Sequence, residues 1–371
     1  MNRIPFLKPN LVTIDDAMPY LRRMEASRIY SNFGPLNTEF ESRILQEYFG
    51  GGGAVTTVHN ATVGLMLGIA AARRPGGRYA VMPSFTFAAT PLAARWCGLE
   101  PYFVDIRPGD LCSDTDCIEQ TVRQLGDEVG VVVPYATFGT ACDLAYYDTL
   151  LARGVPVVVD AAASFGTRTE RGQFGAGFRG SVVFSFHATK AFGIGEGGLV
   201  YSADPELLAR IRQSSNFGFS EARAAEFTGL NGKLSEYAAA IGLATLDRFA
   251  VKSRVRQGIY ANYQALMTER GMLARGWALQ QITGSVPHQF MGVLCPAGRS
   301  NEQYITSLEQ RGIQARKYFS PACHEQPLFQ GSLATSLAVT RDVSSRTLNL
   351  PLWEDLQPAD VLRVVDALDA I

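Results

Sequence analysis

Runs of four or five mostly apolar residues recur along the first half of the chain, and segments with helical periodicity separate them. Four of these runs occupy residues 79–82, 101–104, 131–135 and 155–159. Apolar strands that alternate with helices are typical of a mostly parallel sheet with helices on both faces. In such sheets, ligands bind beyond the carboxyl ends of the strands. The residues that follow these runs are therefore the first candidates for a functional site.

Lys190 lies just past such a strand, in a loop of small residues between two apolar runs. Lysine is rarely buried without a partner, because removing an ammonium group from water is costly. Burial lowers the pKa of the amine, which can then act as a nucleophile and form a Schiff base. Asp160 and residues 84–87 each follow another apolar run. We expect these residues and Lys190 to converge on one crevice.

The turn Asn60-Ala61-Thr62 follows a short strand-like run and precedes a helical segment of small residues. A helix N-terminus binds phosphate through its unpaired N–H groups and the positive end of its dipole, and the Thr hydroxyl adds a donor. The alternative is an ordinary helix cap made by Asn60 and Thr62. Gly64 and Gly68 lie four residues apart, so one face of this helix can approach a sheet closely.

Gly193, Gly195 and Gly198 match the GxGxxG pattern of dinucleotide-binding proteins. That fingerprint requires a helix directly after the glycines. Residues 199–202 have the composition of a strand instead, so we exclude nicotinamide and flavin binding at this site. The glycines are better explained by a turn that lets the backbone pass close to a flat ligand.

Charge and cysteine content exclude several classes of function. The chain has 34 basic and 35 acidic residues and no basic cluster, which argues against nucleic acid or an anionic membrane as a partner. Its six cysteines show no metal-binding spacing, so we expect no metal site and reduced thiols in a cytoplasmic protein. No apolar run reaches the roughly 20 residues that a membrane span requires, and residues 1–13 do not resemble a signal peptide.

The 371 residues are enough for two domains. We predict a large cofactor-binding domain over residues 1–247, with an N-terminal helix and loop, and a small C-terminal domain over residues 248–371. An alanine-rich helix at 237–246 and a basic helix at 247–267 lead from one to the other. The small domain has an α+β pattern, with a strand at 288–293, a helix at 301–310, a strand and loop at 313–318 and a helix at 358–371.

The groups predicted to meet at the strand ends match the needs of pyridoxal 5'-phosphate. Its phosphate requires an N–H cradle, which Asn60, Ala61 and Thr62 can form, and its ring requires a flat apolar neighbour such as Phe87. Its ring nitrogen requires an acid and its aldehyde requires a lysine. Asp160 and Lys190 are the candidates for these two roles.

Two motifs, Ser185-Phe186-His187-Ala188-Thr189-Lys190 and Glu196-Gly197-Gly198, are the most specific in the chain. With them, the chain resembles the DegT/StrS-type sugar-nucleotide aminotransferases, which have the fold-type-I architecture of pyridoxal-phosphate enzymes. The resemblance runs from about Ser31 to the last helix. It implies an α/β fold with a mostly parallel central sheet and a smaller C-terminal α+β domain. Supporting motifs are Asn60-Ala61-Thr62, Pro83-Ser84-Phe85-Thr86-Phe87, Asp160-Ala161-Ala162, residues 229–236, Arg316-Lys317-Tyr318 and Pro321-Ala322-Cys323-His324.

The resemblance implies a role for each matching residue. Lys190 would bind the cofactor aldehyde and then carry the proton, Asp160 would hold the ring nitrogen, and Phe87 would stack on the ring opposite Ala162. Residues expected at the phosphate are Asn60, Ala61, Thr62, Ser185 and, from the neighbouring subunit of a homodimer with shared active sites, Asn231. Residues expected near the nucleotide-sugar are Asn32, Phe33, Gly34, His187, Lys233, Arg316, Tyr318 and His324.

His187 has an alternative role. It resembles a catalytic base by type, but Lys190 can already move the proton, so a structural or supporting role is favoured over catalysis. Two positions depart from the family pattern. Ala61 replaces a usual glycine, and Ala163 stands where Gln, Glu or His is usual, so the ring hydroxyl must find another partner or water.

The implied reaction is transfer of an amino group from an amino acid, with L-glutamate implied as the donor, to a keto carbon of a nucleotide-linked deoxysugar. Pyridoxamine 5'-phosphate would carry the group in the second half-reaction. One alternative is a sugar dehydratase with the same cofactor, which the resemblance disfavours because those enzymes have His where Lys190 stands. Another is a regulatory or binding protein on the same scaffold, which the full set of cofactor residues disfavours.

Overall fold

The computed structural model describes residues 3–371, so residues 1 and 2 of the predicted large domain lie outside the described residues. The main strands are β1 (Ala54–Val58), β2 (Tyr79–Pro83), β3 (Glu100–Val104), β4 (Val129–Val132), β5 (Val158–Asp160), β8 (Ser181–Ser185) and β9 (Gly198–Ser202). They pair in the orders β1-β9-β8-β5 and β3-β2-β4. Bridges from Val132 to Val157 and from Tyr135 to Asp160 join the two groups into one sheet.

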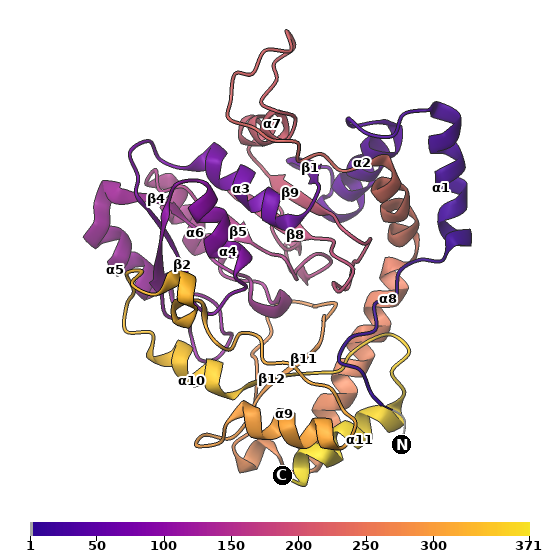
Figure 1. Cartoon of the computed structure of the whole chain (residues 1–371), viewed down its shortest axis with the longest axis vertical. Coiled ribbons are helices and arrows are strands. Elements are labelled where there is room, and N and C mark those ends of the chain that lie inside the picture. Colours follow the sequence, from indigo (N-terminus) through magenta and orange to yellow (C-terminus); the bar gives the residue numbers. More distant parts are fainter. Residues whose placement is uncertain (1–2) are drawn as a thin grey trace.

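The strands of this sheet run parallel to one another, apart from β9, which is antiparallel to both of its neighbours. The predicted mostly parallel sheet is therefore confirmed (Figure 1). Its strands are buried almost throughout because their residues are apolar toward both faces. A short hairpin of β6 (Arg168–Thr169) and β7 (Gly172–Gln173) stands apart from it.

Helices pack on both faces of the sheet and form two separate cores (Figure 1). One face packs against α3 (Ala61–Ala72), α4 (Ala89–Trp96) and α7 (Pro205–Ser214). The opposite face packs against α2 (Pro35–Phe49), α5 (Thr115–Leu125), α6 (Leu144–Ala152) and the first half of α8 (Glu236–Glu269), and α1 (Ile14–Ser27) lies along α8.

The two glycines of α3 let this helix lie close to the sheet, as the sequence predicts. A Cβ atom added at Gly64 would lie 2.9 Å from a methyl group of Val183, and one at Gly68 would lie 3.0 Å from the hydroxyl of Ser181. Larger residues at either position would push α3 away from β8. The N-terminus of α3 is therefore held at a fixed place beside the end of the sheet.

Helix α8 corrects one prediction, because its 34 residues form one helix where the sequence predicts two that meet at residue 247. No proline interrupts this stretch, and the side chains on either side of residue 247 have different cores to enter. Leu243 and Phe249 pack in the core of the large sheet, whereas Tyr263 and Met267 pack in a second core. The domain boundary at residue 247 stays a prediction.

The second core lies around a small antiparallel sheet of β10 (Ala278–Leu279), β11 (Met291–Leu294) and β12 (Thr347–Leu350). Helices α9 (Asn301–Gln310) and α11 (Pro358–Asp369) pack on it, and α10 (Ala338–Arg346) precedes β12. The sequence predicts both packing helices closely but misses β12. The strand predicted at 313–318 forms only isolated bridges, from Ile313 to Ile4 and from Arg316 to Asn349.

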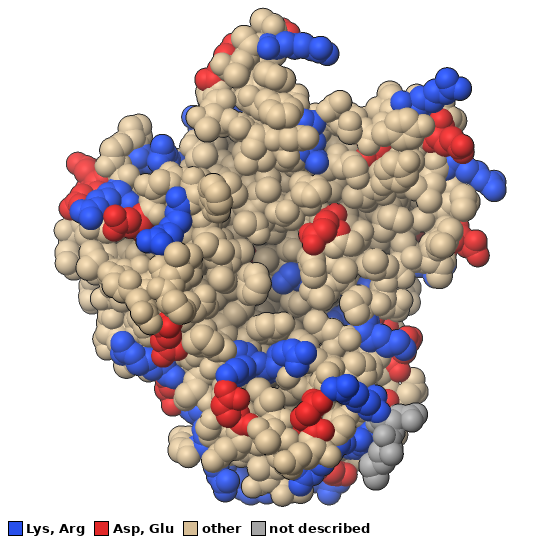
Figure 2. Space-filling view, viewed as in Figure 1, with Lys and Arg blue, Asp and Glu red and all other residues tan. Residues whose placement is uncertain are grey.

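The surface in Figure 2 has basic and acidic side chains intermixed, most densely over the lower part of the molecule. The middle of this face is hollowed, and basic atoms lie at the bottom of the hollow. Within residues 3–371, none of the helices combines the length and the apolar character that crossing a membrane demands.

Candidate active site

Asp160, Ser185 and Lys190 gather at one edge of the main sheet, as the sequence predicts. Asp160 is the last residue of β5, Ser185 is the last residue of β8, and Lys190 lies in the loop from β8 to β9. Strands β5 and β8 are parallel neighbours, so their carboxyl ends meet at the same edge. Asp160 and Lys190 are close enough for each to shift the pKa of the other.

Asp160 is almost completely buried and has two hydrogen-bond donors. Its Oδ2 accepts a hydrogen bond from the hydroxyl of Thr90 at 2.6 Å, and its Oδ1 accepts one from the N–H of Ala162 at 3.1 Å. Burial raises the pKa of the carboxyl, while these donors and the Lys190 charge act in the opposite direction. The carboxyl group is thus fixed in place in a poorly solvated position.

Lys190 is fixed by the backbone of its own loop. Hydrogen bonds from Phe186 N–H to Gly197 C=O at 2.9 Å and from Ala188 N–H to Gly195 C=O at 2.7 Å close the loop. Burial lowers the pKa of the amine to about 8, and the nearby Asp160 charge raises it in part. The direction agrees with the sequence prediction. The amine donates a hydrogen bond to Oε1 of Gln289 at 3.2 Å.

The predicted phosphate cradle lies at the start of α3, next to Ser185. Asn60 caps the helix, since its Oδ1 accepts a hydrogen bond from the N–H of Val63 at 2.9 Å. The N–H groups of Ala61 and Thr62 belong to the first turn, which has no partners for them within the helix. Gly198 pairs with Val58 on one side and Ser185 on the other. It therefore brings the cradle and Ser185 together.

Phe87 comes four residues after the end of β2 and is exposed, with 58% of its surface accessible. Its ring lies 6.3 Å from that of Phe319 at an angle of 52°. Covering this exposed ring with a flat ligand would remove apolar surface from water, so Phe87 is available for stacking. Ala162 is half-buried next to Asp160 and leaves space because its side chain is a single methyl group.

The predicted loop Asn32-Phe33-Gly34 lies at the N-terminus of α2 and is held by α8. Both carboxylate oxygens of the buried Glu236 accept hydrogen bonds of 2.8 Å from the first N–H groups of α2. A side chain at Gly34 would collide with Glu236, since its Cβ would lie 2.7 Å from the carboxyl carbon. The Arg212 guanidinium lies 3.8 Å from the centre of the Phe33 ring.

Asn231 and Lys233 lie at the base of the long loop between α7 and α8, which projects from the molecule in Figure 1. Asn231 is exposed and pairs through its backbone with Asn216. The Lys233 amine donates a hydrogen bond to Asn216 at 2.8 Å and lies 4.7 Å from the ring centre of Phe217. The structure therefore groups these two predicted residues with each other.

Arg316 and Tyr318 come from the smaller part of the chain. The Arg316 guanidinium lies 5.7 Å from the ring centre of Phe6, and the rings of Tyr318 and Phe6 are 6.0 Å apart. Asn349 holds both residues, by backbone hydrogen bonds to Arg316 and by its side-chain oxygen to the N–H of Tyr318.

His324 reaches the end of β2 from the same part of the chain. Its Nδ1 lies 2.7 Å from the hydroxyl of Ser84, the residue after β2, and its backbone N–H donates to the same oxygen. Burial lowers the pKa of the imidazole. His324 is thus brought to the sheet edge that carries Asp160.

The comparisons with known proteins agree with this geometry. A family model described as the DegT/DnrJ/EryC1/StrS aminotransferase family matches residues 13–369. The chain belongs to this family. The aminotransferase class and the fold predicted from the sequence are therefore both confirmed.

Three relatives show how close the likeness is. A Bacillus cereus ATCC 10987 protein assigned as a PLP-dependent aminotransferase is 46% identical over 99% of this chain and 100% of its own, with a TM-score of 0.98. DesI, crystallised in the presence of its TDP-sugar product, is 32% identical over 100% of this chain and 93% of its own, with a TM-score of 0.89. The Escherichia coli dTDP-4-amino-4,6-dideoxy-D-glucose transaminase is 27% identical over 98% of both chains.

His187 lies in the most specific motif of the chain. Its side chain makes its contacts inside its own loop. Its Nδ1 lies 2.8 Å from the hydroxyl of Thr189, and its Nε2 lies 3.7 Å from a carboxylate oxygen of Glu196. The site roles assigned to His187 and to the other residues above stay predictions.

Two polar residues at this aminotransferase site were missed by the sequence reasoning. Thr90 lies in α4 and looks like an ordinary helix residue, although its position shortly after the motif ending at Phe87 was a usable signal. Gln289 lies 99 residues beyond Lys190 in a different part of the chain. Nothing in its local pattern indicates a contact with Lys190.

Proposed function

We propose that this chain is a cytoplasmic, homodimeric transaminase that uses pyridoxal 5'-phosphate. It takes an amino group from an amino acid, for which we propose L-glutamate, and passes it to a keto carbon of a nucleotide-linked deoxysugar. The observation that carries this proposal is the meeting of Asp160, Lys190 and the N-terminus of α3 at one edge of the sheet. The DesI structure with a TDP-sugar product and the name of the E. coli relative support the substrate class.

The residues present fit this cofactor. Asp160 is a buried acid oriented by two donors, which suits a protonated ring nitrogen. The first turn of α3 and the Ser185 hydroxyl suit a phosphate, and Gly198 keeps the space beside them clear of any side chain. The exposed Phe87 ring suits stacking. When bound, pyridoxal phosphate supplies an electron sink that stabilises negative charge on the substrate carbon.

Lys190 has two tasks in this proposal. Its amine would hold the cofactor aldehyde and, when free, would move a proton at Nζ. A pKa of about 8 leaves a fraction of the amine unprotonated near neutral pH, as a nucleophile and a general base require. Asp160 would keep a proton on the ring nitrogen of the bound cofactor. Thr90 and Ala162 hold the carboxylate in one orientation.

The remaining predicted residues concern the contact from a second subunit and the binding of the nucleotide-sugar. We propose that Asn231 reaches the phosphate of the neighbouring subunit, from the base of a projecting loop. Phe217, Phe219 and Phe227 on that loop are each more than a third exposed, which supports a second copy of the chain as its partner. We propose that the nucleotide-sugar lies among Asn32, Phe33, Gly34, His187, Lys233, Arg316, Tyr318 and His324.

An absorbance experiment tests this function and separates it from the alternatives. The purified protein should show the visible band of lysine-bound pyridoxal phosphate, and L-glutamate should bleach it with release of 2-oxoglutarate. Lys190→Ala should lose both the band and turnover, while Arg123→Ala, which changes an exposed basic residue of α5 that pairs with Glu119, should keep both. A dehydratase or a binding protein would show no 2-oxoglutarate. Normal transamination by Lys190→Ala would refute the assignment of this lysine.

The substrate is tested separately. Loaded with the amino group, the protein should aminate members of a panel of nucleotide-linked keto sugars, read by mass spectrometry of the products. Conversion of free keto sugars alone would contradict the nucleotide-sugar assignment.

A further inference from the structure

Gln289 lies two residues before β11 and places its side-chain amide beside the reactive lysine. Its Oε1 accepts a hydrogen bond from the Lys190 amine at 3.2 Å, and its Nε2 donates to the hydroxyl of Thr189 at 3.4 Å. The residue is 9% exposed, so the amide is almost out of contact with water. Both ends of the amide are therefore used within the loop that carries Lys190.

The backbone of Gln289 is held by a buried arginine. Arg256, in α8, donates hydrogen bonds to the carbonyl oxygens of His288 at 2.6 Å, Gln289 at 2.8 Å and Leu352 at 3.0 Å. Its other end forms an ion pair with Glu354 at 2.8 Å. A buried guanidinium with five donors is suited to tie several carbonyl groups together in this way.

His288 fixes the same segment from the other side. Its imidazole stacks on the ring of Tyr260, with 3.6 Å between ring centres and 3° between planes. Burial and the Arg256 charge lower the pKa of this histidine to about 3, so it packs as a neutral ring near neutral pH. Gln289 is thus mounted on a rigid segment whose contacts come from α8 and from residues after β12.

The side chains near the lysine amine are mostly charged. Asp160 is the charge that attracts it, on the side of the sheet edge. A cavity of about 10 Å³, the volume of about one water molecule, is lined by Lys190 together with Lys8, Lys252 and Arg256. His187 in its own loop is turned toward Thr189 and Glu196. The nearby cations disfavour movement of a charged amine toward the cavity.

We propose that Gln289 is a positioning residue for the proposed transamination, which holds the Lys190 amine whenever it is not attached to the cofactor. The proposal rests on the proposed function for its role in the reaction. The contact itself does not require the cofactor, because it joins two residues of this chain.

A neutral amide is suited to this task. A lysine side chain carries about 2 kcal/mol of rotamer entropy, so an amine released into an open cleft would sample many positions. A hydrogen-bond acceptor restricts the amine to one of these positions. A carboxylate at the same place would also hold the amine, but it would raise the pKa and keep the amine protonated. Gln289 orients the amine without removing its basicity.

Acetylation of Lys190 in the cofactor-free full-length protein tests the contact directly. The protein is treated with acetic anhydride at a series of pH values, and modification of the Lys190 peptide is measured by mass spectrometry. Gln289→Glu should move the midpoint of the pH curve upward by about 1 pH unit or more, because it adds an opposite charge within hydrogen-bonding distance. Gln289→Leu should move the midpoint downward, because the charged amine loses its acceptor.

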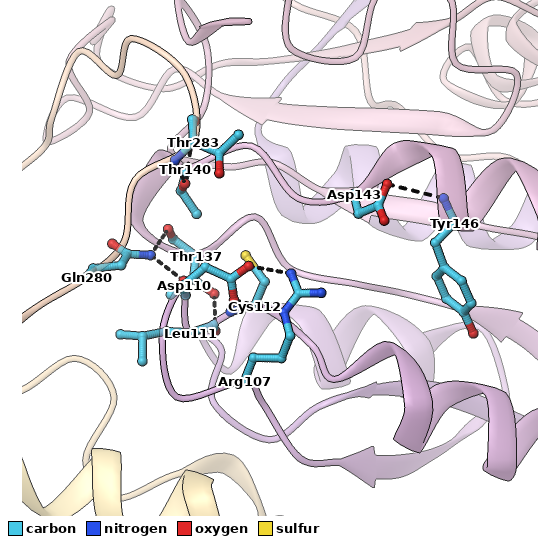
Figure 3. A network of polar contacts seen from close by, with 10 residues as sticks. All are labelled: Arg107, Asp110, Leu111, Cys112, Thr137, Thr140, Asp143, Tyr146, Gln280 and Thr283. Atoms are coloured by element: carbon cyan, nitrogen blue, oxygen red, sulfur yellow. Dashed lines mark hydrogen bonds and ion pairs between the residues drawn. The ribbon is translucent and has the colours of Figure 1, made fainter.

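Steady-state kinetics test the role in the reaction. With cofactor bound, Gln289→Leu should lower kcat about tenfold, through a misplaced proton carrier, and leave the KM values of both substrates within about twofold. Gln280→Leu is the matched control, since Gln280 is 8% exposed and binds the carbonyl oxygens of Asp110 and Thr137 in the separate network shown in Figure 3. This control should keep the wild-type midpoint and kcat.

The outcomes distinguish failure of this inference from failure of the proposed function. Unchanged acetylation midpoints in both Gln289 variants would overturn the inference even if the cofactor band and turnover were normal. Equal losses of kcat in Gln289→Leu and Gln280→Leu would show a general packing effect and would also overturn it. Absence of a cofactor band from the wild-type protein would instead refute the proposed function. Gln289→Glu keeps the size of the side chain, so it remains informative if the leucine variant fails to fold.

Discussion

Gly198→Ala is expected to weaken cofactor binding through a single methyl group. Gly198 lies in β9 between Val58, which precedes the cradle, and Ser185. Its Cβ would lie 2.9 Å from the backbone nitrogen of Ala61, 3.0 Å from the carbonyl carbon of Asn60 and 3.0 Å from the carbonyl oxygen of Phe184. These are backbone atoms of paired strands and a helix start, so no flexible side chain can move away.

The size of the effect follows from the distances. Ordinary contact begins at 3.4 Å, so the backbone around Ala61 must move by about 0.5 Å. Overpacking of this kind costs about 1–3 kcal/mol of stability. A hydrogen bond to a charged group is worth about 1.5–3 kcal/mol, so misplacing one phosphate donor should raise the Kd of pyridoxal phosphate about tenfold to a hundredfold.

The assay is titration of cofactor-free protein with pyridoxal phosphate, followed by the visible band, together with urea unfolding of the same protein. Gly292→Ala is the matched control, because its Cβ would meet Phe138 at an ordinary 3.5 Å and Gly292 lies in β11. The control should bind with the wild-type Kd. Wild-type cofactor affinity in Gly198→Ala would refute the placement of the phosphate beside Ala61.

Three further predictions test the supports of the site. Thr90→Val removes the 2.6 Å hydrogen bond to Asp160, so it should lower the free energy of unfolding in urea by about 1.5–3 kcal/mol, and an unchanged value would contradict this. Because Lys190 has a pKa of about 8, its neutral fraction rises with pH, and acetylation in cofactor-free protein should be about tenfold faster at pH 9 than at pH 7. A rise of about a hundredfold over that range, which a lysine with its ordinary pKa would give, would refute the shift. Glu236→Ala leaves two N–H groups at the start of α2 without acceptors, so it should lower the free energy of unfolding by about 2–6 kcal/mol. A variant as stable as the wild-type protein would contradict this prediction.

Much of the fold could be predicted because the main strands are buried on both faces. Such strands can be recognised as continuous apolar runs, without the alternation of apolar and polar residues that a half-exposed strand shows. The helices between the runs indicate that the strands are parallel. Composition does not reveal direction, however, so the antiparallel β9 has the same apolar pattern as its parallel neighbours. The prediction of two separate helices that meet at residue 247 was wrong for a related reason. The change from alanine-rich to basic sequence marks the point where α8 passes from one hydrophobic core to the other, and the helix itself continues.

The strand-end residues of the site could be predicted because each lies directly after a recognisable strand. Asp160, Ser185 and Lys190 need only the rule that parallel strands end at the same edge. Residues brought in by tertiary packing have no such local signal. Gln289 meets Lys190 only after Arg256 and Tyr260 of α8 have fixed the segment before β11. Its role could not be predicted before the smaller part of the chain was placed.

The surroundings of Lys190 explain why an amide is found at this position. Burial lowers the pKa of the amine more than the Asp160 charge raises it, and the result of about 8 leaves the amine usable as a base. A second carboxylate would shift this balance back toward the protonated form. An apolar residue would leave the amine without the acceptor that Gln289 provides. The amide meets both requirements, so the reactivity of a lysine in the β8–β9 loop depends on a side chain held in place by the other part of the chain.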